Sequence, residues 1–225
     1  MRRTFEIGGK TVFVFHSNRP GSPVIYLNTY SDERQKIYEA VQATGCPPFT
    51  LVTVSNLAWN HDMAPWDSPA AFKKGEPFIG GADNYLQLLV EEIIPRAEKE
   101  LAEPPVWRGI AGYSLAGLFA LYAIYRTDVF SRVGCMSGSL WFPGFKEYIF
   151  SHEPKRRPDC IYFSLGDKEA KTRNSVLKTV QENTEEIQAF YQSKGIDTVF
   201  QLNPGNHFVQ GIERTIAGIQ WLLCR

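Results

Sequence analysis

The chain has 225 residues, of which 44% are hydrophobic and 21% are charged, and its 24 basic and 24 acidic residues give a formal net charge of zero. This composition is typical of a globular protein and excludes a disordered chain or a fibre. Because there is no basic excess, we expect neither nucleic acid nor a membrane as a partner. The length predicts one domain over residues 1–225 and leaves the oligomeric state open.

In chain order, the hydrophobic periodicity predicts strands alternating with helices. It predicts strands at 11–16 and 24–28, then a helix that Ser31 would cap and that ends at Gly45, and a strand at 49–54. A helix at 83–101, bent at Pro95, precedes a strand at 106–111, a buried helix at 115–125 and strands at 133–136 and 161–165. The last predicted elements are a helix at 176–191 closed by Gly195, a strand at 198–202 and a helix at 209–223. Residues 55–81 have no regular period, so we expect an excursion loop there near the site.

This alternation indicates an α/β fold, with a mostly parallel central sheet of about eight strands and helices on both faces. Ligands bind at the carboxyl ends of the strands in such sheets. The residues that follow each strand are therefore the candidates for chemistry.

The amino-terminal segment and the cysteines bear on location. Glu6 and Lys10 interrupt any apolar stretch after Arg2 and Arg3, so no secretory signal is predicted. The apolar run at 115–125 is too short to span a bilayer as a helix. The four cysteines include no C-x-x-C pair, which is typical of reduced thiols, so a cytoplasmic protein is expected.

A serine stands at the junction between the strand at 106–111 and the next helix. The segment Gly112-Tyr113-Ser114-Leu115-Ala116-Gly117 is a G-x-S-x-A form of the nucleophile elbow, in which small residues two positions before and after the serine avoid clashes. Ser114 is the predicted nucleophile, and the backbone N–H of Leu115 is predicted to face an oxyanion. The alternative is a tight turn in which Ser114 only caps the helix.

A serine hydroxyl needs a base to take its proton. His207 follows the last strand, where the chain order Ser…acid…His places the base. We expect His16 to be structural and His152 to be solvated, whereas His61 lies in the 55–81 loop and could line the pocket.

Two carboxylates follow the strand at 161–165, and either could be the acid that orients the histidine. Asp167 and Glu169 are each placed to accept the imidazole Nδ1–H and stabilise the imidazolium. The residues alone do not choose between them.

Several further segments carry a family resemblance. They are the strand Val24-Ile25-Tyr26-Leu27-Asn28-Thr29, the D-x-x-P loop Asp62-Met63-Ala64-Pro65-Trp66, the stretch Gly80-Gly81-Ala82-Asp83-Asn84-Tyr85-Leu86, and the S-x-S-L-W segment Met136-Ser137-Gly138-Ser139-Leu140-Trp141. Together with the elbow, they resemble the putative-esterase branch of the α/β-hydrolases, which includes S-formylglutathione hydrolases, feruloyl esterases, mycolyltransferases and siderophore (enterochelin) esterases. The similarity is strongest to the siderophore esterases.

This resemblance implies an α/β-hydrolase fold and a serine hydrolase that cleaves carboxylic esters, siderophore or other aromatic or small acyl esters, through an acyl-enzyme. It favours Glu169 over Asp167 as the acid and implies a second oxyanion donor at the backbone N–H of Thr29 or Tyr30. Asn28 and Thr29 stand where the family has Asp-Gly, and Ala116 replaces the usual glycine.

No dinucleotide fingerprint, H-E-x-x-H or paired Cys/His spacing occurs, so we expect no cofactor and no metal. The aromatic residues Trp59, Trp66, Phe72, Phe78 and Trp141 fit a core or a pocket wall equally well. Two other functions use the same fold: a binding protein without catalysis, and transfer of the acyl group to an alcohol other than water.

Overall fold

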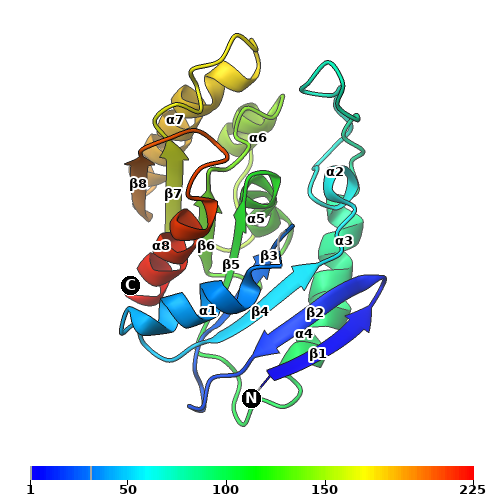
Figure 1. Ribbon diagram of the computed structural model, residues 1–225, viewed down its shortest axis with the longest axis vertical. Coiled ribbons are helices and arrows are strands. Elements are labelled where there is room, and N and C mark those ends of the chain that lie inside the picture. Colours follow the sequence, from blue (N-terminus) through cyan, green and yellow to red (C-terminus); the bar gives the residue numbers. More distant parts are fainter. Residues whose placement is uncertain (1, 31) are drawn as a thin grey trace.

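The computed structural model describes residues 2–30 and 32–225, and its centre is an eight-stranded sheet in the order β1-β2-β4-β3-β5-β6-β7-β8 (Figure 1). The strands are β1 (Arg2–Ile7), β2 (Lys10–Phe15), β3 (Val24–Asn28), β4 (Thr50–Ser55), β5 (Arg108–Tyr113), β6 (Arg132–Met136), β7 (Cys160–Gly166) and β8 (Asp197–Asn203). The β1–β2 and β2–β4 pairs are antiparallel and the other pairs are parallel. The predicted mostly parallel sheet is therefore confirmed.

Helices cover both faces of the sheet. They are α1 (Arg34–Ala43), α2 (Trp59–Asp62), α3 (Ala82–Leu88), the π-helical turn η1 (Leu89–Ile93), α4 (Ile94–Glu98), α5 (Leu115–Arg126), α6 (Phe145–Ser151), the 3₁₀ turn η2 (Leu177–Thr179), α7 (Val180–Ser193) and α8 (Gly211–Leu223). Helices α1 and α8 lie together on one face, and α3 to α7 cover the other (Figure 1). No helix in the described part of the chain is both long and apolar enough to cross a membrane.

The central strand β3 shows why its sequence is apolar without a break. Val24 and Tyr26 pack into the core under α3 to α7, whereas Ile25 and Leu27 pack under α1 and α8. All four are buried, because a parallel strand covered on both faces needs apolar side chains at successive positions. Because these strands are parallel, the carboxyl ends of β3, β5, β7 and β8 lie at the same end of the sheet.

Several local features differ from the prediction, among them helix α6, which was not expected. Strand β1 was not expected: it is an edge strand in which Phe5 alone is buried, so its sequence lacks a clear apolar alternation. The helix predicted at 83–101 is divided by η1 just before Pro95. Proline has no backbone N–H to donate to the carbonyl one turn earlier, and a π-helical turn accommodates that carbonyl. The 55–81 loop contains α2 and a bridge between Ser68 and Phe78.

The predicted cap of α1, Ser31, lies outside the described residues. Helix α1 begins at Arg34, with Glu33 at its N-cap position and no side-chain capping bond there. All four cysteines are free in the structure.

Candidate active site

Ser114 occupies a strained turn between β5 and α5. Its φ of 60° lies in the left-handed region, which non-glycine residues rarely adopt. A Cβ at Gly112 would lie 2.4 Å from the backbone carbonyl carbon of Ala116, so the turn closes only with glycine at this position. The elbow sequence thus has a direct steric reason in the structure.

His207 reaches Ser114 from the loop that joins β8 to α8. Its Nε2 lies 2.9 Å from Ser114 Oγ, and its Nδ1 lies 2.7 Å from Glu169 Oε2. The hydroxyl of Tyr113 donates to the backbone carbonyl of His207 over 2.7 Å and holds this loop against the nucleophile strand. The side chains of Glu169, His207 and Ser114 thus form a continuous series of hydrogen bonds, from a buried carboxylate to a hydroxyl at the carboxyl ends of the strands.

Glu169 is surrounded by donors. Its Oε1 accepts hydrogen bonds from Gly166 N at 2.6 Å, Ser137 Oγ at 2.8 Å and Arg214 Nη1 at 2.8 Å. Burial by itself would raise the pKa of this carboxyl, but the hydrogen bond and charge of His207, with the Gly166 and Ser137 donors, outweigh it and the pKa is lowered. Glu169 is therefore a carboxylate at neutral pH.

Asp167, the other carboxylate left open by the sequence, has a different partner. Its Oδ1 accepts a hydrogen bond from the backbone N–H of Gly205 over 2.8 Å, and its own N–H donates to Asn203. Asp167 thus joins the loop after β7 to the loop after β8. Glu169, not Asp167, is the carboxylate that the structure brings to His207.

The two positions considered for the second oxyanion donor also differ. The N–H of Thr29 donates to the carbonyl of Val54 over 3.0 Å and extends the β3–β4 ladder, so the expectation that it could face an oxyanion does not fit. The next N–H along the chain is that of Tyr30, at the cleft. Leu115 is the first residue of α5, where helix N–H groups have no acceptor within the helix.

A cleft of about 1090 Å³ opens at this edge of the sheet, and Ser114 and His207 are among its walls. Trp59 and His61 of α2 also line it, as the loop position of His61 allowed. The other aromatic residues considered for the pocket divide: Trp66 and Phe78 of the loop pack with Trp141 around Phe142, while Phe72 is exposed. The sequence could not separate these roles. His16 and His152 do not line the cleft.

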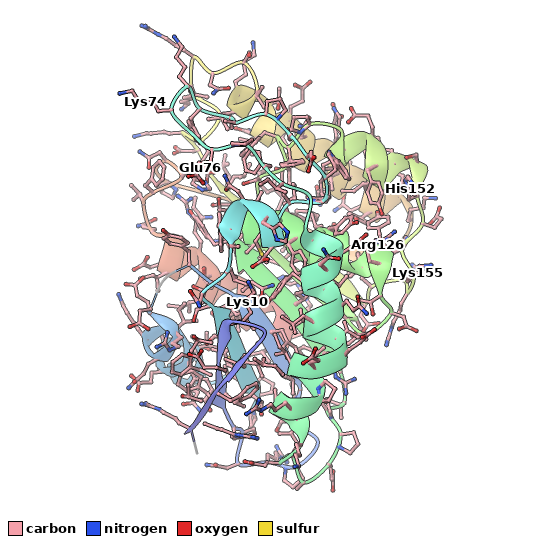
Figure 2. The ribbon with its side chains drawn as sticks, turned by 90° about the vertical axis from the view of Figure 1, so that its right-hand side faces the viewer. Lys10, Lys74, Glu76, Arg126, His152 and Lys155 are labelled. Carbon is pink, nitrogen blue, oxygen red and sulfur yellow. The ribbon has the colours of Figure 1, made fainter. Side chains whose placement is uncertain are left out.

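His61 is held by a buried carboxylate. Its Nδ1 lies 3.0 Å from Asp62 Oδ1, and Asp62 Oδ2 accepts a hydrogen bond from Ala58 N over 2.7 Å. Lys10, which lies at the start of β2 and is labelled in Figure 2, forms an ion pair with the same oxygen. In the described part of the chain, no three His, Cys, Asp or Glu side chains are grouped as metal ligands would be.

Sequence reasoning missed one residue that the site depends on, Arg214 of α8. Its side chain is 1% exposed and donates to Glu169 Oε1, to Ser137 Oγ at 3.0 Å and to Tyr113 Oη at 3.1 Å. Its second terminal nitrogen donates to the carbonyls of Pro204 and Asn206, each at 3.2 Å. The available signal was an arginine within the buried stripe of the last helix, a position that needs a charged partner.

The comparisons with known proteins agree with this architecture. The family model described as "Putative esterase" matches residues 12–218. The uncharacterized protein YbbA of Bacillus subtilis (strain 168) is 22% identical over 188 residues, which are 80% of this chain and 75% of that protein.

Solved structures share the fold at lower identity. An IroE-like serine hydrolase from Shewanella oneidensis has a TM-score of 0.82 and 18% identity, with 100% of this chain and 80% of that chain covered. The siderophore hydrolase EstA from Aspergillus nidulans has a TM-score of 0.77 and 16% identity, with 99% and 94% covered. These likenesses confirm the predicted α/β-hydrolase fold.

Arg214→Met should lower the free energy of unfolding by about 3–5 kcal/mol, because it leaves the buried Glu169 carboxylate without its cation. Arg126→Met is the matched control: its partner is Asp83, both side chains are about half exposed, and the loss should be about 0–1 kcal/mol. Denaturant unfolding measures both. Equal losses in the two variants would contradict the role given to Arg214.

Proposed function

Because the chain belongs to the putative esterase family, a family of carboxylic ester hydrolases, we propose that it hydrolyses esters with Ser114 as nucleophile, His207 as general base and acid, and Glu169 as the group that orients the histidine. The observation that carries this proposal is the pair of contacts made by one imidazole, 2.9 Å to Ser114 Oγ and 2.7 Å to Glu169 Oε2. Both distances are those of hydrogen bonds that can transfer or hold a proton.

In the first half of the reaction, Ser114 Oγ attacks the ester carbonyl carbon while His207 Nε2 takes the hydroxyl proton. The carbonyl oxygen becomes an oxyanion, for which the backbone N–H groups of Leu115 and Tyr30 are the proposed donors. When the tetrahedral intermediate collapses, the carbon–oxygen bond to the alcohol breaks. His207 returns its proton to that alcohol, and the acyl group remains on Ser114.

In the second half, a water molecule replaces the alcohol. His207 takes a proton from the water as it attacks the acyl carbonyl, and the same donors hold the oxyanion. Collapse of this intermediate breaks the bond to Ser114 Oγ, which recovers its proton from His207. The ionised Glu169 stabilises the imidazolium in both halves, because it fixes the Nδ1–H tautomer and supplies the opposite charge.

The cleft volume and the fold neighbours support an ester that is large as a whole, whether its acyl group is aromatic or small. A space of about 1090 Å³ exceeds that of most small-molecule sites. The siderophore hydrolases share the fold, and Tyr30, Trp59 and Phe208 present aromatic surface to the cleft. We therefore propose siderophore-type esters or other esters with aromatic or small acyl groups as substrates.

Ser114→Ala should reduce kcat/KM for a para-nitrophenyl ester by about 10⁴-fold or more, because the bond-forming oxygen is removed and only binding and the oxyanion donors remain. Steady-state kinetics and a matched thermal unfolding scan would measure this. Retained turnover in a folded Ser114→Ala protein would reject the nucleophile, and an inactive wild-type protein would favour a binding function on a hydrolase fold.

The two candidate acids provide a matched pair of variants. Glu169→Gln should reduce kcat by about 10³- to 10⁴-fold, since an amide cannot stabilise the imidazolium and favours the wrong tautomer. Asp167→Asn should leave kcat within about tenfold, because its oxygen can still accept the Gly205 N–H. The reverse order of effects would assign the acid to Asp167.

A further inference from the structure

The described residues that line the cleft include three carboxylates but neither lysine nor arginine. The carboxylates are those of Glu33, Glu76 and Glu213. The three come from separate elements: the N-cap of α1, the 55–81 loop and the first turn of α8. None of them takes part in an ion pair within the described chain.

The cations nearest to these glutamates in sequence are directed elsewhere. Arg34 forms an ion pair with Asp32 and lies 3.4 Å above the ring of Phe13. Arg214 is buried against Glu169. Figure 2 shows Lys74 at the outer tip of the 55–81 loop, whereas Glu76 lies closer to α2.

Helix termini contribute positive potential at this end of the sheet. Helices α1, α5 and α8 begin beside the cleft, and each amino terminus is equivalent to about half a positive charge. Three full negative charges outweigh about one and a half positive ones, so the entrance keeps a net negative potential. The cleft is therefore an unfavourable place for an anion, although the chain as a whole is neutral.

Exposed aromatic rings line the same cleft as these carboxylates. Tyr30 is 83% exposed and Phe208 is 88% exposed, and both line the cleft. Tyr30 packs edge-on against Trp59, with ring centroids 5.6 Å apart. Aromatic faces next to carboxylates attract cations such as ammonium groups, because the ring quadrupole and the negative charge act in the same direction.

We propose that the cleft selects esters that carry a positive charge, such as a protonated amine or a quaternary ammonium group, and disfavours polyanionic esters such as a ferric tris-catecholate. This inference rests on the proposed esterase function and narrows its substrate class. The substrate preference of this chain would then differ from that of any fold neighbour that acts on a polyanion, because it is set by glutamates of this chain's own cleft.

The test uses three para-nitrophenyl esters of one chain length, whose acyl chains end in a trimethylammonium, a tert-butyl or a carboxylate group. The kcat/KM of each is divided by its rate constant for hydroxide-catalysed hydrolysis, which removes intrinsic reactivity. The corrected ratio of cationic to anionic ester should be about tenfold or more at low salt. It should fall toward one at about 0.5 M salt, as expected for exposed charges.

The variant Glu33→Gln/Glu76→Gln/Glu213→Gln should lower that ratio by about fivefold or more, and each single substitution should lower it by about twofold. The matched control is Glu92→Gln/Glu147→Gln/Glu182→Gln, which removes the same charge from exposed positions outside the cleft. The control should leave the ratio within about twofold. Because all six positions are exposed, the single variants are expected to stay folded.

The outcomes separate this inference from the proposed function. If the para-nitrophenyl ester whose acyl chain ends in tert-butyl is hydrolysed, but the corrected ratio of cationic to anionic ester is near one or favours the anion, the charge selection is wrong and the esterase function stands. An equal drop in the cleft and control variants would place the effect in the overall field of the protein and would also overturn the inference. If none of the three esters is hydrolysed, both proposals fail.

Discussion

The buried carboxylate of Glu169 is the group on which the rest of the site depends. It receives hydrogen bonds from Gly166, Ser137 and His207 and an ion pair from Arg214. Removing a carboxylate and a guanidinium from water costs several kcal/mol per ion, and attraction offsets this only where the remaining polar atoms have partners. The donors therefore have to come together from four segments: the loop after β6, the end of β7, the loop after β8 and α8. Their meeting sets the position of His207 and, through it, the hydrogen bond to Ser114.

Much of this architecture could be predicted from local sequence. The apolar runs of the central strands and of α5, with the periodic stripes of α7 and α8, predicted the layers, since burial leaves a strong pattern in the sequence. The elbow at Ser114 was predictable because only small residues fit at Gly112 and Ala116. The position of His207 was predictable because it lies in the loop after the last strand, β8, which is next to β7 in the sheet.

The remainder depends on contacts between residues far apart in the chain. Arg214 and Glu169 are separated by 45 positions, so no periodicity connects them. The choice between Glu169 and Asp167 depends on which way a short loop turns, and both carboxylates follow the same strand. The N–H of Thr29 extends a ladder whose length the sequence of β3 does not define. The charge of the cleft was hidden for the same reason, because Glu33, Glu76 and Glu213 come from three separate elements within a neutral chain.

Catalysis depends on the activation of the Ser114 hydroxyl by the imidazole of His207 beside it. The most direct test is to treat the protein with a fluorophosphonate and to determine the crystal structure of the product. We expect a single phosphorus–oxygen bond at Ser114 Oγ, with the phosphonyl oxygen about 3 Å from the N–H groups of Leu115 and Tyr30. An unlabelled folded protein, or an adduct on another residue, would contradict it.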